Sequence, residues 1–191
     1  MLIGIFGDSF GVKKIDEAFE SWVTLLENNF EIINHCECGV GEYKIMKQLL
    51  SCDLSKFDHI IITHTSASRV FVNYNPIHKN SRDHKNCDII YADISNRDDE
   101  FSHACQLYFK HIFDMTYAID VHNLICEKID NLIRDKNVTH ITHFDYDDLY
   151  AFPDMINFYK LFLKNKGDVN HYNQFGNNEI YKTLKSRLCE Y

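Results

Sequence analysis

Short apolar segments alternate with amphipathic segments along the first seventy residues of this chain. Residues 2–6 (LIGIF), 30–34 (FEIIN) and 59–63 (HIIIT) are short runs rich in apolar or β-branched side chains, which predict buried strands. Residues 14–28 and 43–50 repeat apolar side chains three and four positions apart, the spacing of a helix with one buried face. Strands that alternate with helices predict an α/β fold with a parallel sheet.

The second half of the chain continues this pattern after an interruption. Residues 70–99 lose the periodicity and are rich in Asn, Asp, Lys and His, which predicts an irregular surface excursion. Residues 138–144 predict a fourth strand, whereas 155–163 fit either a strand or a helix. Helical spacing marks three segments: 100–113 and 117–133, which form two helices or one that bends, and a final helix over 175–188. We therefore predict one three-layer α/β/α domain over residues 1–191, with a sheet of about five strands.

Composition and charge narrow the classes of function. The 191 residues carry a formal net charge of −8 and no dense basic run, which argues against nucleic-acid binding and against an anionic membrane surface. The N-terminal residues lack the basic and long apolar regions of a signal peptide, and no apolar stretch is long enough to span a bilayer. The expected location is the cytoplasm.

The seven cysteines are scattered and odd in number, which is typical of reduced thiols. Only Cys36 and Cys38, preceded by His35, resemble a group of metal ligands. A structural zinc site normally needs a second pair of ligands at a matching spacing, and none stands out. The sequence therefore predicts no metal.

The tripeptide Gly7-Asp8-Ser9 closes the first predicted strand. Ligands of open α/β sheets bind outside the carboxyl ends of the strands, so a serine at this point faces a cleft. Asp or Ser before a helix is also an ordinary N-cap, and the tripeptide alone leaves both interpretations open.

A second motif, Asp168-Val-Asn-His171, precedes the final predicted helix. A serine hydroxyl becomes a good nucleophile when a neutral imidazole accepts its proton, and a carboxylate orients that imidazole. Asp and His three residues apart can be presented by one turn. The alternative is a helix-capping Asp beside a surface His.

Taken together, the two motifs resemble those of the SGNH hydrolases, also called the GDSL family. The resemblance implies a flavodoxin-like three-layer fold, with Ser9 as the nucleophile, Asp168 as the orienting acid and His171 as the general base. Gly176 matches a glycine that is common in the family's last motif. The order of elements agrees over nearly the whole chain, but only these two motifs match closely.

The same resemblance implies an oxyanion hole that includes the backbone N–H of Ser9 and a glycine after the second strand. Gly41 fits that glycine, with Gly39 as the alternative. The family's asparagine after the third strand is absent, so Ser66, Thr65 or His64 must supply the remaining donor. Loss of one such donor lowers turnover by about 10²–10³-fold.

These observations predict a serine esterase that needs no cofactor and hydrolyses an O-acyl group, preferably an O-acetyl group on a carbohydrate. Arg69 follows the segment after the third strand, where the family's asparagine is missing, and is a candidate for binding an anionic group of the substrate. A surface ion pair is the commoner role of such an arginine. Three alternatives stay open: acyl transfer by the same triad, a non-catalytic binding or structural protein on the same scaffold, and a flavodoxin-like nucleotide binder. The last lacks a Gly-rich phosphate loop.

Overall fold

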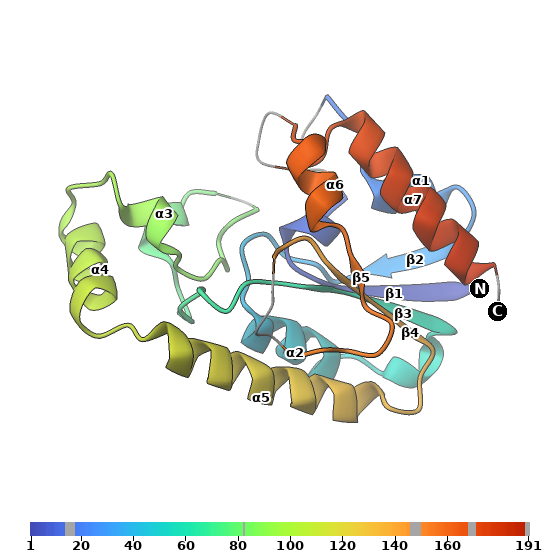
Figure 1. Cartoon of the computed structure of the whole chain (residues 1–191), viewed down its shortest axis with the longest axis horizontal. Helices are drawn as coiled ribbons and strands as arrows, with labels where there is room; N and C mark the ends of the chain where they lie inside the picture. Colours follow the sequence, from blue (N-terminus) through green and yellow to red (C-terminus); the bar gives the residue numbers. More distant parts are fainter. Residues whose placement is uncertain (14–17, 82, 146–149, 168–170, 190–191) are drawn as a thin grey trace.

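The centre of the molecule is a five-stranded, all-parallel sheet with the strand order β2-β1-β3-β4-β5 (Figure 1). This computed structural model describes residues 1–13, 18–81, 83–145, 150–167 and 171–189. The strands are β1 (Leu2–Gly7), β2 (Glu31–Asn34), β3 (His59–His64), β4 (Val138–Thr142) and β5 (Ile156–Asn157). The predicted α/β fold with about five parallel strands is confirmed.

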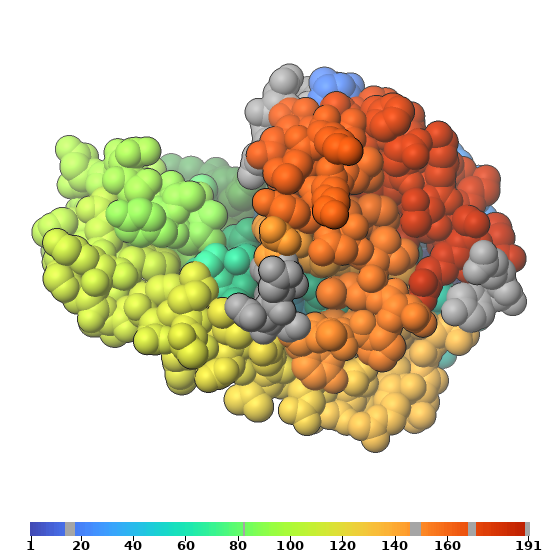
Figure 2. All heavy atoms as spheres, in the orientation of Figure 1, coloured from blue at the N-terminus to red at the C-terminus, as the bar shows by residue number. Residues whose placement is uncertain are grey.

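Helices cover both faces of the sheet (Figure 1). One face carries α1 (Trp22–Glu27), α6 (Tyr159–Lys164) and α7 (Gln174–Leu188), and the other carries α2 (Glu42–Leu50) and α5 (Met115–Ile133). Helices α3 (Tyr91–Ile94) and α4 (Glu100–His111) form a lobe to one side of the sheet (Figure 2). Short 3₁₀ turns lie at Ser9–Gly11, Leu54–Lys56 and Pro76–His78.

Alternation along the strands divides the apolar core into two layers. Ile3 and Ile5 of β1 pack with α1 and α7, whereas Phe6 of the same strand packs with α2 and α5. Ile61 and Ile62 of β3 divide in the same way because neighbouring strand residues face opposite sides. All five side chains are fully buried, and each such burial stabilises the fold by about 1.5–3 kcal/mol.

Several predicted elements differ in extent from the structure, among them the first helix and the fourth strand. The helix expected from residue 14 begins at Trp22, because the Ser21 side chain accepts the Thr24 N–H and caps the helix there. Residues 14–17 lie outside the described residues. The strand expected over 138–144 ends at Thr142.

The two ambiguous segments are also settled. Residues 155–163 contain both elements, since the short edge strand β5 is followed almost at once by α6. Segments 100–113 and 117–133 are separate helices, and Asp114 caps the second through the Tyr117 N–H. Among the described residues, no helix combines the length and apolar character needed to cross a membrane.

The described residues of the 70–99 excursion are mostly irregular, but the excursion is anchored to the body. An antiparallel bridge joins Val70 to Ile89, and the backbone N–H of Asp88 donates to Gly39. Asp88 and Ile94 are fully buried. The excursion therefore forms part of the walls around the carboxyl ends of the strands.

Candidate functional site

The turn after β1 places Ser9 at the carboxyl end of the sheet. Gly7 ends the strand with a φ of 145°, a conformation that glycine adopts and L side chains rarely do. The carboxylate of Asp8 then accepts the Phe10 N–H and the Thr63 hydroxyl, which fixes the 3₁₀ turn that starts at Ser9. The order of strands reverses between β1 and β3, so Ser9 lies at the topological switch point where ligands of such sheets bind.

Asp8 is fully buried beneath this turn. Burial raises the pKa of its carboxyl group, and the attraction of Arg69 and the hydrogen bonds from Phe10 and Thr63 oppose that rise. These contacts make Asp8 a support for the turn. Ser9 is partly exposed, and among the described residues no hydrogen bond engages its hydroxyl or its N–H. Both groups are therefore available to a ligand.

His171, from the other end of the sequence, lies beside the turn that contains Ser9, with its ring centroid 4.9 Å from that of Phe10. Ser9 and His171 line one cavity of about 30 Å³, together with Phe10 and Tyr172. Helix α7 packs against α1 (Figure 1), and the hydrogen bond from the Trp22 N–H to the Asn177 side chain joins the two helices. Asp168, the predicted orienting acid, lies outside the described residues.

A second histidine, His143, lies behind Phe10. Its ring stacks on Phe10 at a centroid distance of 4.4 Å, and its Nδ1 lies 2.8 Å from the Tyr172 hydroxyl, which itself donates to the Phe158 carbonyl. The Tyr172 hydroxyl therefore accepts from an Nδ1–H of His143, which leaves Nε2 unprotonated. That Nε2 is buried and has no hydrogen-bond partner among the described residues. Burial and the nearby His171 lower the pKa of His143 to about 3.

We expect the stability of the protein to fall steeply between pH 6.5 and pH 4. Burial lowers the pKa of His59 to about 4 and that of His140 to about 2, so with His143 three rings stay neutral in the fold. The unfolded chain protonates each ring near pH 6.5. Below that pH the free energy of unfolding therefore falls by about 1.4 kcal/mol per pH unit for each ring, or by about 4 kcal/mol per pH unit for the three rings together. Asp8 acts in the opposite sense, because its raised pKa favours the folded state in acid.

Urea unfolding at several pH values, followed by circular dichroism, measures this slope. His143→Phe should lower the slope by about 1.4 kcal/mol per pH unit, since Tyr172 keeps its bond to Phe158 and one titrating ring is lost. Substitution of the exposed His103 by Gln should leave the slope unchanged. A flat stability curve from pH 7 to pH 4 would contradict the neutral state of these rings.

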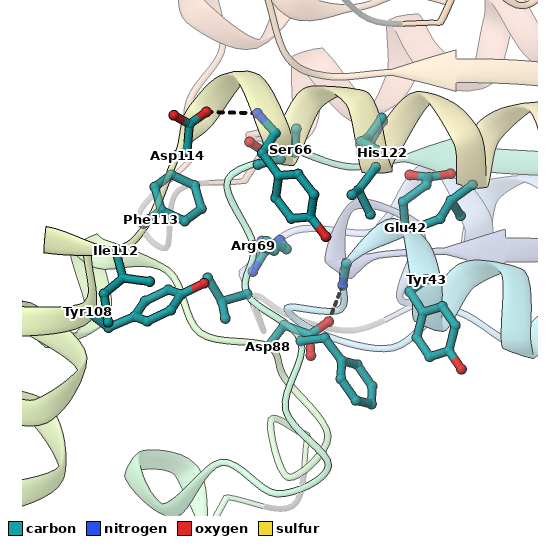
Figure 3. Close-up of a pocket in the computed structure, with 18 residues that line it drawn as sticks. Glu42, Tyr43, Ser66, Arg69, Asp88, Tyr108, Ile112, Phe113, Asp114 and His122 are labelled. Carbon is teal, nitrogen blue, oxygen red and sulfur yellow. Dashed lines mark hydrogen bonds between the residues drawn. The ribbon is translucent and has the colours of Figure 1, made fainter. Parts of the chain in front are cut away.

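A larger cavity of about 680 Å³ lies on the α2 and α5 side of the strand ends (Figure 3). Apolar and aromatic side chains of α4, α5 and the connection between them line one part of it, including Tyr108, Phe113 and Tyr117. Its polar wall includes Arg69 and Asp88. The excursion, the turn after β3 and the helices α2, α4 and α5 all contribute to this cavity.

The predicted oxyanion donors Gly41 and Ser66 line this larger cavity, whereas Ser9 and His171 line the smaller one. The Gly41 N–H donates to the Asp88 carboxylate at 2.7 Å (Figure 3). The Ser66 hydroxyl lies 2.7 Å from that of Ser68. In this arrangement both groups are bound within the protein, so their role as oxyanion donors stays a prediction.

The other candidates of the third motif are engaged as well. Arg69 donates from Nε to the Thr65 hydroxyl and from a terminal nitrogen to the Gly39 carbonyl, so it braces two loops. The ring nitrogens of His64 lie 2.7 Å from Glu42 and 2.9 Å from His140. Among the described residues, the Ser9 N–H and the N–H of Gly39, the alternative glycine, form no hydrogen bond, whereas Gly41, Ser66, Thr65 and His64 are engaged.

Glu42 belongs to a buried polar cluster that the sequence analysis missed. Its carboxylate bonds His64 and accepts the Thr65 N–H, and donor atoms of Glu42, His122 and Cys126 all lie within 4.8 Å of one another. Burial raises the pKa of Glu42, but the attraction and hydrogen bond of His64 outweigh it, so the net pKa is lowered. The one sequence signal was the four-residue spacing of His122 and Cys126 on a predicted helix, which places both on one face.

The remaining sequence-based expectations for this region are also resolved. His140 and His143 face opposite sides of the sheet, since one packs on Phe152 and the other on Phe10. All seven cysteines are free thiols. His35, which precedes the Cys36 and Cys38 pair, stacks on Phe6.

Comparison of the chain with protein-family models and with curated proteins finds no match in either case.

Proposed function

We propose that this protein is a serine ester hydrolase in which Ser9 is the nucleophile and His171 is the general base. The observation that supports this most directly is the shared cavity, to which the turn after β1 contributes the hydroxyl and the segment before α7 contributes the imidazole. These are the residues that the resemblance to the SGNH hydrolases pairs. Their place at the switch point of a parallel sheet is where a substrate is expected.

In this mechanism the Ser9 oxygen attacks the acyl carbon while His171 takes the hydroxyl proton. The Ser9 N–H stabilises the oxyanion of the tetrahedral intermediate. His171 then gives its proton to the departing alcohol, which leaves an acyl group on Ser9. Water attacks the acyl carbon while His171 takes one of its protons; the bond to the Ser9 oxygen then breaks, His171 returns the proton to that oxygen, and the carboxylic acid departs. Asp168 orients the His171 ring in this proposal.

The preferred substrate is a short-chain ester, with an acetyl group on a carbohydrate as the leading candidate. The cavity beside Ser9 measures about 30 Å³, close to the volume of one water molecule, which suits a methyl group better than a long acyl chain. Exposed rings of Phe71 and Tyr117 at the larger cavity offer flat surfaces for a sugar.

A fluorophosphonate probe tests the nucleophile. We expect one covalent adduct per chain by intact-mass spectrometry, located at Ser9, and no adduct in Ser9→Ala. Ser9→Ala should turn over p-nitrophenyl acetate only at the background rate. The parent protein should prefer the acetate ester over the octanoate ester because the cavity is small.

Ser95→Ala is the matched control, because Ser95 ends α3 far along the chain from the strand turn and lines neither cavity. It should label and turn over like the parent protein. Failure of the parent protein to form an adduct, with p-nitrophenyl acetate turnover equal to that of Ser9→Ala, would overturn the proposed function.

A further inference from the structure

The strongest unassigned feature is the group formed by Glu42, His122 and Cys126 at one end of the larger cavity. The carboxylate, imidazole and thiol donor atoms all lie within 4.8 Å of one another. Glu42 and His122 line the cavity and lie side by side in Figure 3, and Cys126 is one helical turn beyond His122 on α5. All three residues are buried, with exposures of 1–5%.

Two of the three donors are uncommitted. Among the described residues, neither the ring nitrogens of His122 nor the thiol of Cys126 forms a hydrogen bond. The His122 ring faces the cavity with no hydrogen-bond partner among the described residues, so its nitrogens are free to bind a ligand there. A metal ion is one such ligand.

The third donor is already oriented. Glu42 begins α2 and is held by His64 at 2.7 Å and by the Thr65 N–H at 3.2 Å. Hydrogen-bonded carboxylates of this kind are typical of metal sites, where outer partners fix the direction of the ligand. Each carboxylate oxygen has a second lone pair, so these contacts leave Glu42 able to bind an ion.

We propose that Glu42, His122 and Cys126 bind a zinc ion, with a fourth coordination position directed into the larger cavity. Nitrogen, sulfur and oxygen donors together suit Zn²⁺, a borderline-soft ion, and three protein ligands with one open position are typical of accessible zinc sites. The charges balance as well, since a carboxylate and a thiolate neutralise the ion and a neutral imidazole adds none. The open position accepts water or an anionic oxygen of a ligand in the cavity.

The required movement is small. Bond lengths of about 2.0–2.3 Å in a tetrahedral zinc site place ligand atoms about 3.3–3.7 Å apart. The observed upper limit of 4.8 Å is longer by about one ångström, a difference within the reach of side-chain rotation. Helices α2 and α5 already pack together, so their backbones need not rearrange.

The test is metal binding to the full-length protein after chelation and dialysis. Cobalt(II) serves as the probe, because coordination by a thiolate produces a charge-transfer absorption band and a tetrahedral site produces characteristic visible bands. We expect one equivalent of cobalt to bind with both signals and to be displaced by one equivalent of zinc. Cys126→Ala should lose the thiolate band, and His122→Gln should weaken zinc affinity by about a hundredfold or more.

Cys38→Ala is the matched control, because Cys38 is also buried but lies in the predicted Cys36–Cys38 pair. It should keep the thiolate band, with all variants checked for folding by circular dichroism. The proposal is overturned if folded wild-type protein binds no cobalt at micromolar concentration, or if the band persists in Cys126→Ala or disappears in Cys38→Ala. The readout does not depend on ester turnover, so it stands apart from the proposed hydrolase.

Discussion

Replacement of His171 by alanine should lower ester turnover by about 10⁴-fold or more while the protein stays folded. The imidazole is the only predicted base in the cavity that contains Ser9, and without it the serine hydroxyl keeps its proton. The backbone role of His171 survives the change, since its carbonyl accepts the Gly167 N–H at 2.6 Å. Initial rates with p-nitrophenyl acetate measure the effect.

His143→Phe is the matched control for this substitution. The ring of His143 also stacks on Phe10, but His143 does not line the Ser9 cavity. The turnover rate of His143→Phe should stay within about threefold of the rate of the parent protein. Loss of one transition-state hydrogen bond would lower the rate by more than that. Added imidazole should restore part of the activity to His171→Ala alone. A loss of less than tenfold in His171→Ala would rule out this residue as the base.

Substitution of Gly7 by alanine should destabilise the fold by about 4 kcal/mol, from backbone strain and overpacking together. A Cβ atom at this position would lie 2.5 Å from the Thr63 carbonyl oxygen, in a backbone conformation that L residues rarely adopt. The neighbours cannot yield, because Thr63 belongs to the central strand β3 and the Gln48 side chain binds both the N–H and the carbonyl of Gly7. Urea unfolding measures the change.

Gly4→Ala is the appropriate comparison, since Gly4 lies on the same strand. A Cβ there meets the rings of Phe6 and Phe57 at 2.9–3.0 Å, and side chains can move where a strand backbone cannot. We expect about 1–2 kcal/mol of destabilisation, typical of mild overpacking. If Gly7→Ala and Gly4→Ala lower the free energy of unfolding equally, the positive φ at Gly7 contributes little to the destabilisation.

The fold could be predicted from the sequence because the signals for its elements are local. The β-branched run of β3 and the periodic apolar residues of α2 and α7 each reflect burial on one or both faces. The errors fall where a single contact decides the boundary. Ser21 begins α1 through its cap, and β5 is too short to carry a period of two.

The candidate site likewise has parts that could be predicted from the sequence and parts that could not. Ser9 and His171 could be proposed from the sequence because each belongs to a recognisable motif, and in the structure both line one cavity. The engagement of Gly41 by Asp88 was not predictable, since it depends on how an irregular excursion folds back. The grouping of Glu42 with His122 and Cys126 depends likewise on the packing of two helices that are distant in sequence.

The cavity that Ser9 and His171 share also has a consequence for biosynthesis. A ribosome makes β1 and its serine early, but the histidine emerges only after all five strands. A nascent chain can therefore hold a complete central sheet and still lack the base that would activate its serine. Under the proposed mechanism, hydrolytic activity begins only when the last helix leaves the ribosome and docks, so an unfinished chain is inert toward esters.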